Sequence, residues 1–299
     1  PVTTPPKTDG GMCEDHDKKH DDKKGDIAKC EKDDESCEMD DDDGNDDDRD
    51  HEANVCRNGL ADLDLNRLAA LRVQYRDVTG DYVNKNSFGA LTTPVSKSVS
   101  VSYHVGSVAT PFAFSANYDR VIGQMDVTAS NAFVKDAAGV ALPAHRKFGS
   151  HFLVDSLVLQ NTVGRHFVKA ARSVSVTNHL GRRLCVQAQH IEKVERVVGR
   201  VDLLAFSAVN MQDQTASIAK FIGRMRVEDR NVRQITEGVG RLVLVNSKVG
   251  VLKDFHGVII LENSQVAEMS NVHGKVILRG NSRINWVDPN QHRPKLKQE

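Results

Sequence analysis

The densest run of chemically active side chains is acidic and lies between Met39 and Glu52. Hard cations such as Ca²⁺ take several oxygen ligands at once, and a glycine such as Gly44 lets the backbone curl around the ion. The alternative is a solvated run that pairs only with lysines and arginines. The sequence therefore predicts calcium as a cofactor, with these ligands: Asp40, Asp41, Asp42, Asp43, Asp46, Asp47, Asp48, Asp50 and Glu52.

Four of the five cysteines lie in the same polar segment: Cys13, Cys30, Cys37 and Cys56. An even number of cysteines in a short polar segment predicts two disulfides, and sequence leaves the three possible pairings open. Disulfides persist in oxidising compartments, so we expect an extracellular protein. Zinc is the rival interpretation, because three histidines lie nearby: His16, His20 and His51. Cys185 is left over as a rung residue or a free thiol.

Basic side chains recur in phase along the second half of the chain, each directly after a glycine: Arg165, Arg182, Arg200, Arg224, Arg241 and Lys275. We call this set the basic column. If its members stack about 5 Å apart, neighbouring charges repel by roughly 0.8 kcal/mol even in water. The column therefore predicts a groove for an anionic partner, either an acidic polysaccharide or an Asp-rich segment of a neighbouring subunit. The alternative is a set of flexible side chains that extend into water.

The elements that position these side chains repeat with a constant step of seventeen positions, and each unit starts at a glycine: Gly223, Gly240, Gly257 and Gly274. Within a unit, apolar residues at the third and fifth places lie on one face of a strand. A period of about 20 residues is typical of a solenoid, whose units bury their apolar faces against each other. The sequence predicts an all-β parallel β-solenoid, with a β-sandwich as the alternative. The solenoid prediction requires Leu244, Leu261 and Leu278 to form one interior column.

Less regular glycines extend the repeat backwards: Gly199, Gly181, Gly164 and Gly149. They predict about eight rungs, a rung being one coil of the solenoid. The unit from Gly199 to the glycine at 223 is longer than the regular units by seven positions. Its extra length predicts a loop near 205–220, and such loops are the usual place for binding function.

Composition divides the chain into four parts: an acidic leader at 1–56, a mixed cap or assembly region at 57–148, the solenoid at 149–290 and a polar tail at 291–299. The leader carries 21 Asp and Glu against 8 Lys and Arg, whereas the rest carries 20 against 32. Opposite net charges favour docking of the leader on a basic body. In the cap region, 60–78 suits a helix and 98–105 alternates as a strand does.

The rung length is similar to that of bactofilins, which polymerise end to end by stacking their solenoids. This resemblance covers about half of the chain and rests on the period. It implies self-assembly. The acidic, cysteine-bearing leader departs from that family and weighs against an intracellular cytoskeletal role.

No nucleotide-binding loop, HExxH or GxSxG motif occurs, and carboxylates do not form a ladder, so we expect no enzymatic activity. His256 and His273 end successive units and should stack. No run of 18 apolar residues predicts a membrane span, and we expect no nucleic-acid partner. The sequence favours a secreted structural protein that assembles with itself into a filament or surface layer. The alternative is an extracellular β-helix that binds or cleaves acidic polysaccharide.

Overall fold

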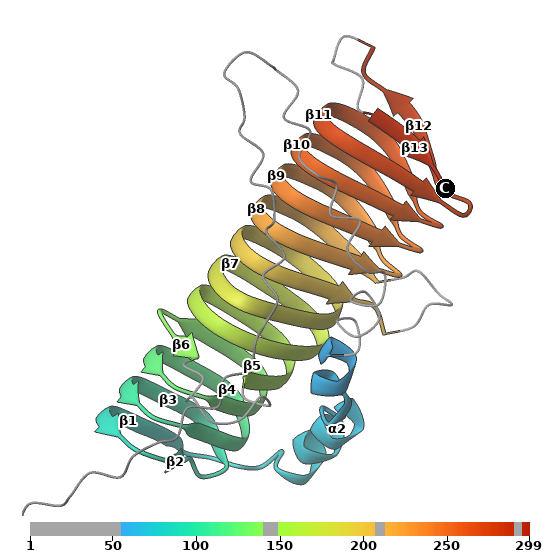
Figure 1. Ribbon diagram of the computed structural model, residues 1–299. Helices are drawn as coiled ribbons and strands as arrows, with labels where there is room; N and C mark the ends of the chain where they lie inside the picture. Colours follow the sequence, from blue (N-terminus) through green and yellow to red (C-terminus); the bar gives the residue numbers. More distant parts are fainter. Residues whose placement is uncertain (1–54, 140–148, 207–212, 290–294) are drawn as a thin grey trace, which may run out of the picture. The chain divides into compact units, whose positions relative to one another are not determined.

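The computed structural model describes residues 55–139, 149–206, 213–289 and 295–299. In these ranges the chain winds into a parallel β-solenoid of about 12 rungs with roughly 17 residues each (Figure 1). The predicted fold class is confirmed, but the predicted number of eight rungs is too low. In the same ranges, no helix is long and apolar enough to cross a membrane.

The described elements are a helical turn at 55–61, one longer helix and thirteen strands, and every strand pairing is parallel. Their bounds are α2 (Leu65–Gln74), β1 (Asp81–Phe88), β2 (Leu91–Thr92), β3 (Ser96–Val105), β4 (Val108–Ile122), β5 (Met125–Lys135), β6 (Ala138–Gly139), β7 (Ser150–Leu204), β8 (Gln214–Glu228), β9 (Asn231–Val245), β10 (Lys248–Glu262), β11 (Gln265–Arg279), β12 (Arg283–Val287) and β13 (Lys295–Gln298).

The interior is built from columns of like side chains. Leu244 pairs in register with Leu261, which pairs with Leu278, so the predicted interior column is confirmed. Leu244 and Leu261 are fully buried, and Leu278 packs against the same core at its C-terminal end. Because each rung is too small to bury its own apolar face, this stacking is the main source of stability.

A column of glycines marks one corner of every rung. Gly257 has a φ of 132°, and a Cβ atom on it would lie 2.0 Å from the carbonyl oxygen of Gly240 in the preceding rung. Any side chain would clash with that backbone and strain the dihedral angle. Glycine is therefore required once per rung, which explains why the period is visible in the sequence.

A second corner lies three residues before each of these glycines, where the backbone is also left-handed. Asn161 and Asn178 occupy it with φ values of 53° and 55°. Asn and Asp tolerate this conformation better than other side chains. Asn178 donates from Nδ2 to Asn161 Oδ1 at 2.8 Å, and Asn161 donates likewise to Asp136 Oδ1 at 2.8 Å. These contacts tie successive corners together.

The solenoid begins at Asp81, far earlier than the predicted start at 149. Strands β1 to β6 are rungs of the same sheet, so most of the predicted cap region belongs to the solenoid. The expected strand at 98–105 lies within β3. Gly149 is not part of the glycine column, because Gly139 pairs with Gly164. The rung between these two paired glycines is longer than a regular one, and this irregular length hides the phase in the sequence.

The C-terminal end differs from the predicted polar tail. Strand β12 pairs with the first part of β11, and β13 pairs with its last part, from Lys275↔Lys295 to Leu278↔Gln298. Two short strands thus cover two sides of the last complete rung. Residues 295–298 are therefore part of the solenoid.

Helical residues lie beside the solenoid at 55–61 and in α2, together called the docked helical segment (55–74) (Figure 1). Asp64 caps α2 by accepting a hydrogen bond from the Asn66 backbone N–H at 2.9 Å. Leu68 packs against Phe112 and Leu153, which point outward from the rungs. The single helix expected at 60–78 is present in part: α2 runs from Leu65 to Gln74, and residues 60–61 belong to the preceding helical turn, with a break at 62–64.

Candidate functional site

The basic column is in register where strand pairings define it. Arg200 pairs with Arg224, Arg224 with Arg241, and Lys275 with Val258. Lys295 in β13 extends the column by pairing with Lys275. The prediction that these charges stack along one side is confirmed for this part of the column. Like charges one strand spacing apart require nearby counter-charges.

Arg182 does not take the place that the sequence predicted. Leu184 and Val186 are interior, three and five places after Gly181, whereas the interior places after Gly199 are two and four. One extra residue therefore follows Gly181, and the strand alternation places Arg183 in line with the rest of the column. Arg183 is buried, while Arg182 is exposed. Burial and the charge of Arg182 both lower the pKa of the adjacent Arg165.

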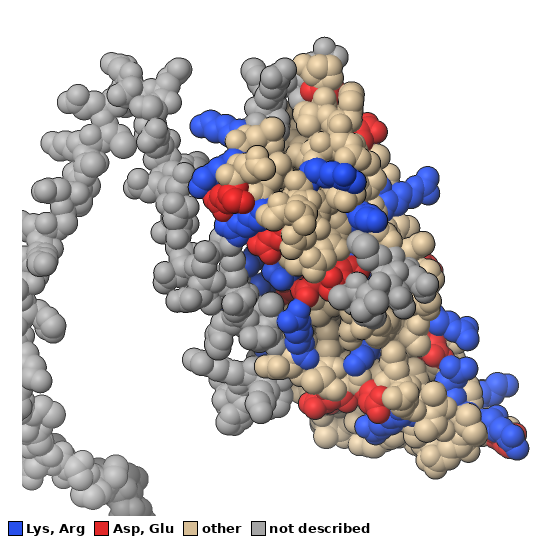
Figure 2. Space-filling view, turned by 90° about the vertical axis from the view of Figure 1, so that its right-hand side faces the viewer, with Lys and Arg blue, Asp and Glu red and all other residues tan. Residues whose placement is uncertain are grey.

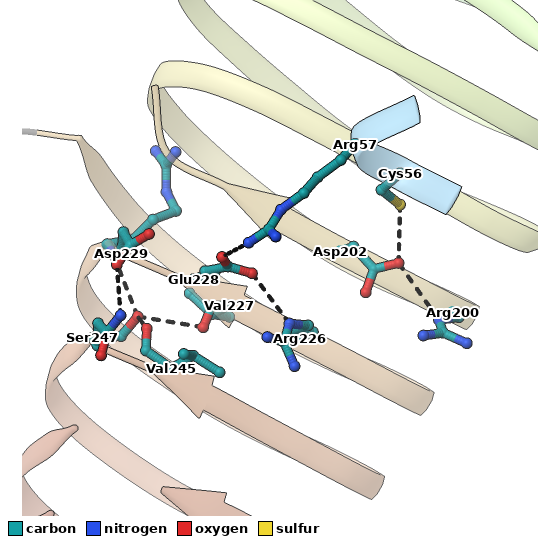
Figure 3. A network of polar contacts seen from close by, with 12 residues as sticks. Cys56, Arg57, Arg200, Asp202, Arg226, Val227, Glu228, Asp229, Val245 and Ser247 are labelled. Atoms are coloured by element: carbon teal, nitrogen blue, oxygen red, sulfur yellow. Dashed lines mark hydrogen bonds and ion pairs between the residues drawn. The ribbon is translucent and has the colours of Figure 1, made fainter. Parts of the chain in front are cut away.

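Two buried carboxylates in neighbouring outward columns partly neutralise this charge (Figure 3). Asp202 is 1% exposed and forms an ion pair with Arg200 at 3.4 Å. Glu228 pairs with Arg226 at 3.2 Å and with Arg57 of the docked helical segment. On the face in Figure 2, Lys and Arg side chains likewise stand beside Asp and Glu.

Two effects act in opposite directions on the pKa of the Asp202 carboxyl group. Burial raises the pKa of its carboxyl group, because desolvation disfavours the charged form. The positive charges of four arginines lower it: Arg200, Arg183, Arg224 and Arg226. A buried ion pair of this kind costs much desolvation, and removing one partner leaves an uncompensated charge. Asp202 is therefore a structural counter-charge for the middle of the basic column.

The disulfide prediction for Cys56 is wrong in its pairing. Cys56 is joined to Cys185, with a Cα–Cα distance of 5.5 Å. The cause is the packing of 55–61 on the solenoid, where Leu60, Phe167 and Leu204 form a small apolar cluster around the bond. Cys185 is therefore part of a disulfide and is not a free thiol. The remaining cysteines, Cys13, Cys30 and Cys37, lie outside the described residues.

Cys56, Cys185 and Asp202 also place three potential metal-ligand atoms within 4.8 Å of one another. Cys56 Sγ lies 3.0 Å from Asp202 Oδ2 (Figure 3). A disulfide sulfur has no proton, so this contact becomes a hydrogen bond only when reduction creates a thiol that donates to the carboxylate. Zinc requires deprotonated thiolates and usually a fourth ligand. Metal binding and the disulfide therefore exclude each other.

The predicted calcium ligands lie outside the described residues, as does the tip of the predicted binding loop at 207–212. The base of that loop is closed by Phe206, whose backbone N–H donates to Asp213 Oδ2 at 2.6 Å. Beside it is a pocket of about 310 Å³, whose lining includes Arg57, Lys169 and Glu228.

A buried arginine, which the sequence analysis missed, holds the base of the same loop. Arg230 is fully buried, and its guanidinium donates to three carbonyl oxygens at 2.7–2.9 Å: those of Ala188, Leu204 and Gln214. Burial lowers its pKa to about 10, opposed by Asp213, so it stays charged at neutral pH. In the next rungs the same corner holds Ser247 and Ser264.

Two histidine pairs differ in environment. His256 and His273 stack on the surface with ring centroids 4.7 Å apart, as the sequence predicted. His166 and His179 lie in the core, 5.2 Å apart, and the sequence analysis did not identify them. Burial lowers the pKa of His166 to about 3, with a further contribution from His179, and lowers that of His179 to about 4. Both are therefore neutral at physiological pH.

Three carboxylates on neighbouring rungs, which could serve acid–base chemistry, are engaged in structural contacts. Glu228 and Glu262 pair with arginines, and Asp229 accepts a hydrogen bond from Asn246 at 3.0 Å. The arrangement offers basic side chains in register, which can bind anionic groups. Comparison of the chain with protein-family models, curated proteins and solved structures finds no match.

Proposed function

We propose that this chain is a secreted structural protein that assembles with copies of itself, with the acidic leader of one subunit docking on the basic column of the next. The observation that carries the proposal is the in-register stacking of Arg200, Arg224 and Arg241 in a body opposite in net charge to its leader. Asp202 and Glu228 supply counter-charge beside the middle rungs. The acidic leader of a neighbouring subunit would add negative charge along the whole column.

Electron microscopy and sedimentation of the full chain and of a chain lacking residues 1–54 test this proposal. The truncation ends before Cys56, so the disulfide to Cys185 is retained. We expect extended assemblies from the full chain and loss of them on truncation. A full-length leader with the nine candidate calcium ligands changed to Asn or Gln is the matched control for charge, and it should also fail to assemble. Dispersed particles from the unaltered full chain would overturn the proposal.

Calcium binding by the acidic run is the second part of the proposal. Dense carboxylates around Gly44 suit a hard cation, and a bound ion would stiffen the leader. Calorimetric titration of the full chain with CaCl₂ should release heat that is absent in the Asn and Gln variant. Identical protease cleavage patterns of the leader in calcium and in EDTA would contradict it.

Secretion is supported by the disulfide between Cys56 and Cys185, because such bonds persist outside reducing compartments. Mass spectrometry of peptides from freshly isolated protein, with thiols blocked at lysis, should recover these two cysteines linked. Recovery of both as blocked thiols would argue against an oxidising location.

The alternative function is binding of an acidic polysaccharide along the basic column. The in-register stacking of Arg200, Arg224 and Arg241 favours it, because basic side chains at one strand spacing present a row of donors to a polyanion. Arg224→Ala with Arg241→Ala should abolish binding to an acidic glycan. Lys248→Ala with Lys253→Ala removes the same charge from exposed places outside the column and should leave binding unchanged. Equal loss in both variants would show only non-specific charge attraction.

A further inference from the structure

An apolar ridge runs along one narrow side of the solenoid. It is formed by the residue directly before each glycine of the column, whose side chain points outward. Eight of these side chains are large, apolar and 38–89% exposed: Phe88, Val105, Ile122, Val163, Leu180, Val198, Ile222 and Val239. Ala138 fills the place between Ile122 and Val163, and His256 and His273 end the ridge.

The ridge is straight because its members are in register. Phe88 pairs with Val105 and Val105 with Ile122, and at the other end Val198 pairs with Ile222 and Ile222 with Val239. In between, the glycines that follow the ridge residues stack directly on one another. Eleven members one strand spacing apart span about 48 Å.

The fold does not require apolar residues here. In most rungs the side chain before the ridge member points inward and fills the core, as Val121, Phe221 and Phe255 do. The ridge side chains face water, where a polar residue would serve equally well. A contiguous exposed apolar surface of this extent marks an interaction site.

We propose that the ridge binds the ridge of a second copy of this chain, antiparallel, about a two-fold axis at Leu180. Leu180 is the sixth of the eleven members, so this alignment overlaps the two ridges completely. Val163 then faces Val198 of the other copy, Ile122 faces Val239, and the highly exposed Phe88 ring faces His273. A two-fold interface uses the same surface of both subunits, which a straight periodic ridge satisfies along its length.

The charges on one flank favour the antiparallel direction. The left-handed corner residues beside the ridge include Arg120, Asp136, Lys220 and Glu237. The two-fold at Leu180 places Arg120 opposite Glu237 and Asp136 opposite Lys220, each with opposite sign. These contacts would add to the ion pair that Lys220 and Glu237 form within one chain at 3.8 Å. Complementary charges at an interface set register and orientation.

The other flank opposes the antiparallel pair, because Arg165 faces Arg200 of the second copy and Arg183 lies opposite its own counterpart. Arg200 is paired with Asp202 within its own chain, which offsets part of this repulsion. In a parallel pair, the corner flank would face the basic column, bringing Arg196 against Arg200, Lys220 against Arg224 and Glu237 against Arg241. Only the last of these contacts joins opposite charges, whereas both charged contacts on the corner flank of the antiparallel pair do, so the antiparallel direction is favoured.

Engineered cysteines test the alignment in a full-length background with Cys13, Cys30 and Cys37 changed to Ser. Leu180→Cys should give a disulfide-linked dimer on mild oxidation. Val105→Cys alone should not, because its two copies would lie about 38 Å apart. Mixing Val105→Cys with His256→Cys should give a mixed dimer. Dimers of Val105→Cys alone would overturn the antiparallel alignment.

Sedimentation tests the pairing itself. At dilutions where extended assemblies dissociate, the smallest species of the full chain should sediment at twice its mass of 33.0 kDa, and Leu180→Asp should halve the mass of that species. Leu296→Asp is the matched control, because Leu296 is 57% exposed against 55% for Leu180 and lies outside the ridge. A monomer in the unaltered chain, or equal dissociation by both variants, would overturn the proposal. Pairing does not need the leader, so dimers should persist after removal of residues 1–54 even if leader-dependent assembly fails.

Discussion

Cys56 and Cys185 are joined by a disulfide that closes a separation of 129 residues and fastens the docked helical segment to the middle of the solenoid. Around the bond, Leu60 and Phe167 form an apolar cluster, and Arg57 reaches Glu228 on a later rung. The segment is thus held by covalent, apolar and ionic contacts at one place.

Loss of this bond should destabilise the fold. Cys56→Ser should lower the free energy of unfolding by about 2–4 kcal/mol, because a long closed loop restricts the unfolded chain. Urea denaturation followed by circular dichroism measures the change. Cys56→Ser with Cys185→Ser should cost about the same as either single variant, since all three remove one bond. A double variant with the summed cost of both singles would contradict this account.

Gly238 should be intolerant of a side chain. A Cβ atom there would lie 2.5 Å from Phe221 and 2.7 Å from Phe255, whose rings fill the core on either side. Gly238→Ala should cost about 1–3 kcal/mol by overpacking, measured by thermal or urea denaturation. Phe221→Leu in the Gly238→Ala background should recover part of this loss by making room. A neutral Gly238→Ala would show that the rings can move apart.

Stability should fall on acidification because His166 and His179 are buried and neutral. Their folded-state pKa values of about 3 and about 4 lie below the unfolded value near 6.5. The unfolded chain therefore binds more protons, and the free energy of unfolding decreases as pH falls below about 6.5. Urea denaturation between pH 7.5 and pH 5 should show this slope.

The matched variant for this pH effect is His166→Leu, which removes one of the two titrating groups. It should flatten the slope between pH 7.5 and pH 5 without abolishing it, because His179 remains. His256→Leu removes an exposed histidine instead and should leave the slope unchanged. An unchanged slope in His166→Leu would show that other groups control the acid response.

Arg230 should be necessary for order around the loop base. Arg230→Met keeps much of the side-chain volume but leaves the carbonyl oxygens of Ala188, Leu204 and Gln214 without their donor. Each unsatisfied buried polar group costs about 1–3 kcal/mol. Hydrogen exchange should accelerate at residues 204–206 and 213–215. Arg233→Met, at an exposed place three residues later in β9, is the control and should leave exchange unchanged.

The interior columns could be predicted because the same local requirement recurs in every rung. A glycine is needed at one corner, and apolar residues must alternate after it, so Leu244, Leu261 and Leu278 were assigned correctly. The earlier rungs carry the same signal, since the glycines at 89, 106 and 123 are separated by the same constant step. The longer rung from Gly139 to Gly164 breaks the phase, which is why the start at Asp81 was missed.

The sequence by itself determined the coil length, the glycine corner and the stacking of charged and apolar residues, because each depends on neighbours at a constant separation. Only the tertiary structure decided the partner of Cys56, the burial of Arg183 in place of Arg182 and the position of Arg230 in the core. These depend on a docked helical segment, an extra residue after Gly181 and the start of a loop. Each of these features is an exception to the period. The contacts that stabilise it do not recur from rung to rung, so the repeat cannot reveal them.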